Sequence, residues 1–219
     1  SAAIGTSASP NIVGLAGDTY YPSGNITLYA VYVSYSGDYT KVTTDLTNWS
    51  GKYLIVYEAG GKAFDGSLET LDATSNYIEV EITSSTIVSD ATTDASSFTI
   101  AQSDGICTRK SNSGYYIGQT SNANGLSQST TAYTNNISYY ADGESIDVIS
   151  SGGAYLRFNY ASNQLRFRYY KSDTFTGQQP IQLYKQTATF NTNPNCPMPS
   201  SLTITYEPNG TNVTGSVTD

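Results

Sequence analysis

Two short phrases recur in this chain at the same spacing, and this recurrence constrains its fold more than any other feature. Gly114-Tyr-Tyr-Ile-Gly118 is followed 39 residues later by Gly153-Ala-Tyr-Leu-Arg157. At the same offset, Asn124-Gly-Leu126 corresponds to Asn163-Gln-Leu165. A constant offset between two phrases indicates an internal structural repeat. The alternative is that both phrases are common strand–turn sequences that recur by chance.

A weaker copy lies upstream, with Gly61-Lys-Ala-Phe64 in place of the first phrase and Asn76-Tyr-Ile78 in place of the second. Each copy is preceded and followed by a strand-like run, which predicts three units of four strands each. The units span residues 50–100, 103–140 and 144–185. Units of this size cannot bury an apolar face alone, and closing them around a threefold axis removes exposed sheet edges. We therefore expect an all-β, β-trefoil-like barrel at 39–186, with short β segments flanking it at both ends and a β-sandwich as the alternative.

The composition supports an all-β fold and argues against several classes of function. The 20 Tyr far outnumber the 6 Phe, and Tyr and Thr favour strands while Gly, Asn and Ser favour turns. The net charge of −8 argues against nucleic-acid binding, which requires a basic face. No apolar run is long enough for a membrane helix. Histidine is absent and the cysteines are two and distant, so we expect no enzyme, no cofactor and no metal site.

A basic and aromatic segment occupies the third unit. Five of the chain's ten Lys and Arg lie between Arg157 and Lys185, against one acid, Asp173. In the run that starts at Leu165, side chains alternate between two faces. Arg166, Arg168 and Tyr170 therefore share one face, while Leu165 and Phe167 point inward. An Arg/Tyr surface suits sugar rings and acidic groups. We predict a ligand-binding site made of Arg157, Tyr160, Arg166, Arg168 and Tyr170. The alternative is that these Tyr pack inside the barrel wall and these Arg pair with surface acids.

The segment at residues 17–32 resembles a known repeat. It closes with Thr27-Leu-Tyr-Ala-Val-Tyr32, and the Listeria–Bacteroides repeat, also called the internalin B repeat, usually ends in Thr-Leu-Tyr-Ala-Val-Trp. That repeat is a small β-grasp-like spacer of bacterial surface proteins. The resemblance implies that residues 1–36 are the C-terminal part of such a repeat.

A second resemblance begins at residue 50. Its motifs are Ser50-Gly-Lys-Tyr-Leu-Ile-Val-Tyr-Glu58, Ser113-Gly-Tyr-Tyr-Ile-Gly118, Tyr155-Leu-Arg-Phe-Asn159 and Gln178-Gln-Pro-Ile-Gln-Leu-Tyr-Lys185. They are similar to a β-trefoil-like module of surface and secreted proteins of gut Bacteroidetes, which implies an extracellular or cell-surface location and no catalytic signature. Trefoil lectins usually hold sugars at polar turns, and Asp65-Gly66 and residues 122–124 are turns of that kind. The Gln-x-Trp signature of ricin-type trefoils is missing from all three units.

The remaining features lie near the end of the chain. We expect residues 187–219 to be a Pro-rich linker followed by the first strand or strands of an Ig-like module. Alternatively, this tail packs back on the trefoil or adds a strand to another molecule. Cys107 and Cys196 would form one disulfide in an exported protein, or else be a small buried strand residue and a loop thiol. Because the chain starts at Ser1 without Met, we expect it to be a fragment of a longer protein.

These features predict a non-catalytic binding module of the cell surface or the secreted fraction. Its expected partner is a glycan, with acidic or mucin glycans as candidates, or a host surface protein. The alternative is a structural spacer, stalk or filament and adhesin subunit that self-associates and binds no small ligand.

Overall fold

The computed structural model describes residues 32–140, 142–161, 163–171 and 177–191. Val33–Thr189 form one compact unit, and the other unit, Ser1–Tyr32 with Phe190–Asp219, falls almost entirely outside the described residues. The expected surface repeat, the Ig-like strands and Cys196 lie in that second part of the chain, so they stay predictions.

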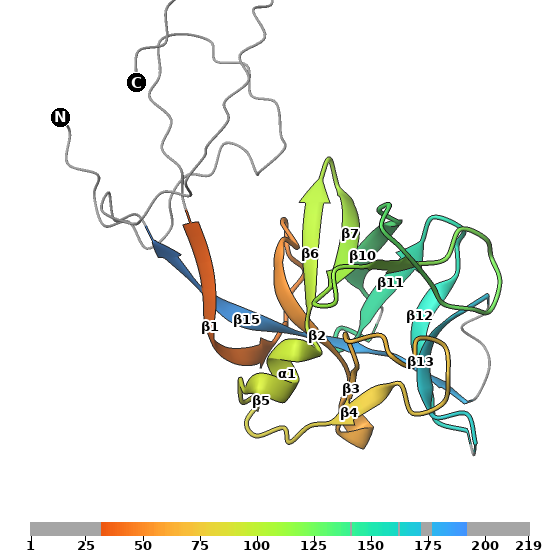
Figure 1. Cartoon of the computed structure of the whole chain (residues 1–219), viewed down its shortest axis with the longest axis horizontal. Helices are drawn as coiled ribbons and strands as arrows, with labels where there is room; N and C mark the ends of the chain where they lie inside the picture. Colours follow the sequence, from red (N-terminus) through yellow and green to blue (C-terminus); the bar gives the residue numbers. More distant parts are fainter. Residues whose placement is uncertain (1–31, 141, 162, 172–176, 192–219) are drawn as a thin grey trace, which may run out of the picture. The chain divides into compact units, whose positions relative to one another are not determined.

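The described chain is all-β, as the sequence predicted, with only short helical turns (Figure 1). The strands before residue 104 are β1 (Tyr32–Lys41), β2 (Gly51–Tyr57), β3 (Lys62–Phe64), β4 (Tyr77–Glu79), β5 (Thr86–Ile87) and β6 (Phe98–Ser103). The next group is β7 (Ile106–Ser111), β8 (Tyr116–Gly118), β9 (Ser127–Ser129) and β10 (Thr134–Tyr139). The last group is β11 (Ile146–Ser150), β12 (Tyr155–Asn159), β13 (Arg166–Tyr170), β14 (Gln178–Gln179) and β15 (Gln182–Asn191). The helical elements are η1 (Glu58–Gly60) and α1 (Ala91–Ala95).

The strands form one sheet whose defined registers are antiparallel. The order is β13-β12-β11-β10-β7-β6-β2-β15-β1-β5, and three strand triplets, β2-β3-β4, β7-β8-β9 and β11-β12-β13, pair in succession. This path has open ends, so the sheet is not closed into a barrel. The strand order therefore confirms an antiparallel all-β fold but not the expected β-trefoil. The reason is local: among the described residues, β11 meets the start of β15 through a single backbone bridge to Ile181, the residue before β15, in which Ile146 N donates to Ile181 O over 2.8 Å.

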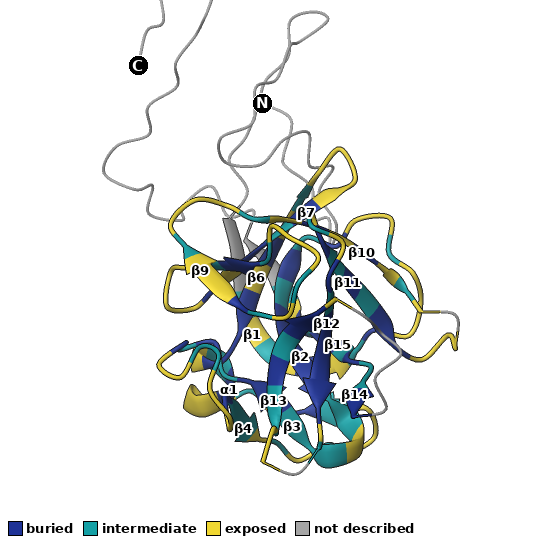
Figure 2. Ribbon diagram, turned by 90° about the vertical axis from the view of Figure 1, so that its right-hand side faces the viewer, coloured by how far each residue is buried: buried dark blue, intermediate teal, exposed yellow. Residues whose placement is uncertain are grey.

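Strand β2 is the centre of the core because both of its faces are buried (Figure 2). Successive strand residues point to opposite faces. Tyr53 and Ile55 therefore enter the larger apolar cluster, while Leu54 and Val56 enter a smaller cluster with Tyr184. All five of these side chains have no exposed surface. A continuous apolar run of this kind is expected for a strand covered on both sides.

The repeated glycines have a common backbone requirement. Gly61, Gly114 and Gly153 have φ angles of 58°, 93° and 87°, which is the left-handed region that favours glycine. A Cβ on Gly114 or Gly153 would meet no atom within 4 Å, so backbone conformation rather than space explains glycine there. Each of the three lies in the turn between the first two strands of its triplet.

Candidate ligand-binding pocket

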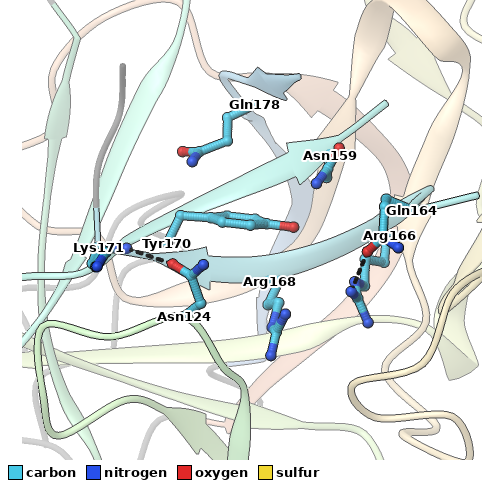
Figure 3. A pocket seen from close by; sticks show the side chains of 8 residues that line it. All are labelled: Asn124, Asn159, Gln164, Arg166, Arg168, Tyr170, Lys171 and Gln178. Carbon is cyan, nitrogen blue, oxygen red and sulfur yellow. Dashed lines mark hydrogen bonds between the residues drawn. The ribbon is translucent and has the colours of Figure 1, made fainter. Parts of the chain in front are cut away.

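A pocket of about 370 Å³ lies against strand β13 (Figure 3). Three of the five predicted site residues line it, together with side chains from β12, β14 and a loop between β8 and β9. The lining residues are Asn124, Asn159, Gln164, Arg166, Arg168, Tyr170, Lys171 and Gln178. Figure 3 shows the Tyr170 ring in the middle of these side chains.

Strand alternation explains why β13 contributes three side chains to the pocket. Phe167 and Tyr169 point to the opposite face and have no exposed surface. Arg166, Arg168 and Tyr170 face the pocket, as the alternating sequence predicted. Tyr170 is nevertheless only 4% exposed, because its ring lies among the other lining residues.

A loop from the first strand triplet holds the two arginines in place. Arg166 Nη1 donates to the backbone oxygen of Asp72 over 2.8 Å, and Arg166 Nη2 donates to Gln164 Oε1. Arg168 Nε lies 3.0 Å from Asp72 Oδ1 and forms an ion pair with it. Asp72 thus orients both side chains from one side, although it lies about 95 positions earlier in the sequence.

The 119–126 loop is fixed on the other side of the pocket. Asn124 Oδ1 accepts a hydrogen bond of 3.1 Å from the backbone N–H of Lys171. Gly125 and Tyr169 exchange two backbone hydrogen bonds, both 3.1 Å long. These contacts attach the loop to the end of β13 and leave the Lys171 side chain exposed at the pocket.

Buried polar atoms of the pocket lack partners within the described residues. Tyr170 Oη and Gln178 Oε1 are buried and form no hydrogen bond there. Gln178 is only 9% exposed as a whole residue. The Nε atoms of Arg166 and Arg168 are also without a hydrogen bond, since the Arg168–Asp72 pair has charge proximity but not hydrogen-bond geometry. A buried polar group without a partner costs roughly 1–3 kcal/mol, so such a concentration at one pocket requires an explanation.

The charge of the pocket is positive in a chain of net charge −8. Three of the described lining residues are cations and none of the described ones is acidic; the one described acid that pairs with them is Asp72. The remaining lining groups are amides and a phenol. The arrangement can therefore donate several hydrogen bonds and favours an anionic group.

The other two predicted site residues lie outside this pocket lining. Arg157 is 3% exposed, and its Nη2 donates to Asp147 Oδ1 over 2.6 Å. Its guanidinium also lies 5.0 Å from the ring centre of Tyr155 and 5.7 Å from that of Tyr140. Tyr160 is half exposed. Arg157 thus has the packing and pairing role that the sequence left as the alternative.

Several pocket residues were missed in the sequence. Asn159, Gln164 and Gln178 are polar residues in or beside strands; they belong to motifs quoted above for their recurrence or resemblance, but nothing in those motifs indicates contact with a ligand. Asn124 belongs to the turn at 122–124, one of the two polar turns that the sequence suggested for sugar binding. In the other turn, the Asp65 carboxylate accepts hydrogen bonds of 2.9 Å from the N–H and the hydroxyl of Ser67.

Within the described ranges, no three His, Cys, Asp or Glu side chains are grouped to hold a metal ion. Cys107 is buried and forms no disulfide there; because Cys196 lies outside those ranges, the bridge between them stays a prediction. No helix in the described part of the chain is both long and apolar enough to cross a bilayer.

No protein-family model matches this chain, and no curated protein sequence is significantly similar to it.

Proposed function

We propose that this chain is a non-catalytic binding module whose ligand is a glycan, held in the pocket on β13. The observation that carries the proposal is the pair of buried polar atoms, Tyr170 Oη and Gln178 Oε1, that have no partner within the described residues. Sugar hydroxyls both donate and accept hydrogen bonds, so one sugar can satisfy a phenol and an amide oxygen together. The Tyr170 ring offers an apolar wall for the C–H face of a sugar.

We further propose that the three strand triplets form a β-trefoil-like arrangement. Three observations support it: the successive pairing within each triplet, the left-handed glycine in each first turn, and the bridge between Ile146 and Ile181. In this arrangement β2, β6, β7, β10, β11 and β15 would form the barrel wall, and the bridge would supply the contact between β11 and β15.

We propose an extracellular or cell-surface location, with a glycan or a glycosylated host surface protein as the partner. The support is the resemblance of residues 17–32 to the internalin B repeat and of the motifs from Ser50 to Lys185 to the Bacteroidetes surface module. The Tyr-rich and weakly charged composition is in keeping with this location. A spacer without a ligand would leave the unpartnered atoms of the pocket unexplained.

The test is glycan-array binding by the wild-type chain and by Tyr170→Phe. This substitution removes one hydroxyl and keeps the ring, so we expect affinity for the bound glycan to fall by roughly 3- to 10-fold, the value of one neutral hydrogen bond. The thermal midpoint should stay equal or rise, because an unpaired buried hydroxyl is removed. Tyr115→Phe, which changes an exposed tyrosine outside the pocket, is the matched control. Binding that is indifferent to Tyr170→Phe, or no binding to any glycan, would contradict the proposal.

A further inference from the structure

The guanidinium group of Arg168 has hydrogen-bond donors without partners in the described part of the pocket. Its Nε forms an ion pair with Asp72, and its Nη1 and Nη2 form no hydrogen bond with the described residues. Arg166 differs, because both of its terminal nitrogens already donate, to Asp72 and to Gln164. Arg168 therefore has two parallel donors available, which is the geometry that binds a carboxylate or a sulfate in a bidentate manner.

The neighbouring groups favour an anion over a neutral ligand. Arg166 and Lys171 add two further cations to the lining, and none of the described lining residues carries a carboxylate. Asp72 compensates only part of this charge, and it lies on the Nε side of Arg168. Among the described lining residues, Gln178 Oε1 is a buried carbonyl oxygen without a hydrogen bond, so it requires a donor such as a hydroxyl or an amide N–H from the ligand.

The size of the pocket limits how much of a glycan it can hold. At about 370 Å³ it is near the lower end of the range for small-molecule sites, which is roughly 300–1,000 Å³. It is therefore suited to one sugar residue and not to a stretch of polysaccharide. A site that encloses one residue recognises chain ends or side-chain caps.

We infer that the pocket binds a single terminal anionic sugar, whose carboxylate or sulfate is held by Arg168 and whose hydroxyl or amide donates to Gln178 Oε1. This inference rests on the proposed glycan-binding function and specifies its ligand class. The carboxylate and the sulfate share the same chemistry at Arg168, so the experiment separates them.

The experiment measures binding of small glycosides by titration calorimetry. The probes are methyl glucuronide, the methyl glycoside of N-acetylneuraminic acid and galactose 6-sulfate, each compared with its uncharged counterpart: methyl glucoside, the sialic acid methyl ester and galactose. We expect at least one anionic probe to bind about tenfold or more tightly than its uncharged counterpart. A preference among the three would identify the anion as a carboxylate or a sulfate.

Two variants locate the anion. Arg168→Lys keeps the charge but loses the two parallel donors, and should reduce affinity for the anionic probe by about tenfold without affecting the uncharged one. Lys171→Glu reverses an exposed charge at the rim and should also weaken the anionic probe selectively. Lys110→Ala, which removes an exposed cation outside the pocket lining, is the control and should change nothing. Thermal unfolding of Arg168→Lys shows whether the variant is folded, so that a lower affinity is not caused by loss of the fold.

The outcomes separate this inference from the proposed function. Equal affinity for anionic and uncharged probes, with no effect of Arg168→Lys or Lys171→Glu, would overturn the anionic assignment while leaving glycan binding at Tyr170 in place. No binding by any probe or by any glycan on the array would overturn both. Selective loss of the anionic probe in both pocket variants, with Lys110→Ala unchanged, would establish the assignment.

Discussion

At the scale of single residues, Cys107 shows how burial changes acid–base behaviour. The residue is 1% exposed, and burial raises the pKa of its thiol to about 11, with a small opposing effect from Arg109. In the unfolded chain the pKa is near its ordinary value, 9.0. The folded pKa is thus raised, so the protonated thiol contributes stability that is complete below pH 9 and is lost as the pH rises through 11.

We therefore expect the free energy of unfolding to fall between pH 8.5 and 10 under reducing conditions, and to fall less steeply in Cys107→Ala. The measurement is urea unfolding at closely spaced pH values with a reductant present. The window ends at pH 10 because burial also raises the pKa of Tyr39 and Tyr53, whose ordinary value is 10.0. Parallel pH profiles for the wild type and the variant would show that the thiol is not the group responsible.

Arg109 is a buried arginine whose surroundings differ from those of Arg168 in the pocket. It is fully buried without a carboxylate partner among the described residues, and its Nη2 donates to Asn135 Oδ1 over 3.2 Å and to Tyr169 Oη. Burial lowers the pKa of this arginine, and its Nε and Nη1 form no hydrogen bond with the part of the chain that the structure describes. Its role is to connect β7, β10 and β13 through neutral partners, which differs from the solvent-accessible Arg168 on the opposite face of β13.

At the scale of elements, Asn76, the residue before β4, connects the loop at Leu71 with β13, which is far away in the sequence. Its Nδ2 donates to the backbone oxygens of Leu71 and Phe167 over 2.8 and 2.9 Å, and its Oδ1 accepts from Phe167 N over 2.8 Å. Asn76 is 1% exposed, and its two hydrogen bonds with the backbone of Phe167 are buried. One side chain thus pairs both main-chain groups of β13 at this position.

We expect Asn76→Ala to destabilise the fold by roughly 2–4 kcal/mol, because it leaves two or three buried backbone groups without partners. Chemical denaturation gives this value. Asn122→Ala, at an exposed position, should stay within about 0.5 kcal/mol of the wild type. A similar small effect for Asn76→Ala would mean that water or another side chain replaces the amide.

Particular elements show how far the sequence determines the fold and the pocket. The alternation on β13 was sufficient to place Arg166, Arg168 and Tyr170 on one face, because strand periodicity is local. Asp72 and Gln178 could not be assigned to the site, because their approach to β13 depends on loop conformation and on pairing between distant segments. Strand β15 runs through the expected boundary at residue 187, since its pairing with β1 does not require an apolar sequence.

The short helix α1 was not expected from the sequence either. It has five residues, too few to show a helical period. Its start is fixed by a capping box in which Asp90 accepts hydrogen bonds from the N–H groups of Thr92 and Thr93. Hydrogen bonds from the same backbone groups lower the pKa of the Asp90 carboxyl, in agreement with a charged cap.

At the scale of the whole described unit, four phenylalanines from different strands form one aromatic core. Phe167 of β13 lies 5.2 Å from Phe64 of β3 and 4.9 Å from Phe158 of β12, measured between ring centres. Phe98 of β6 lies 5.2 Å from Phe64. Because these rings come from the first triplet, the third triplet and β6, these elements share one apolar core.

This shared core predicts cooperative unfolding. We expect Phe167→Ala to cost roughly 3–5 kcal/mol and to shift a single unfolding transition, although the residue lies in the third triplet. Phe64→Ala should shift the same transition, and the double variant should lose less than the sum of the two, by about 0.5–1.5 kcal/mol, because the stacked pair is removed once. Urea unfolding, followed by both tyrosine fluorescence and circular dichroism, measures these free energies and the number of transitions. Tyr160→Ala, at a half-exposed position, is the control.

Two separate transitions, only one of which responds to Phe167→Ala, would mean that the triplets fold independently. The pocket on β13 would then lose the support that Asp72 and Asn76 give it from the first triplet, so the geometry of the site depends on the cooperativity of the core.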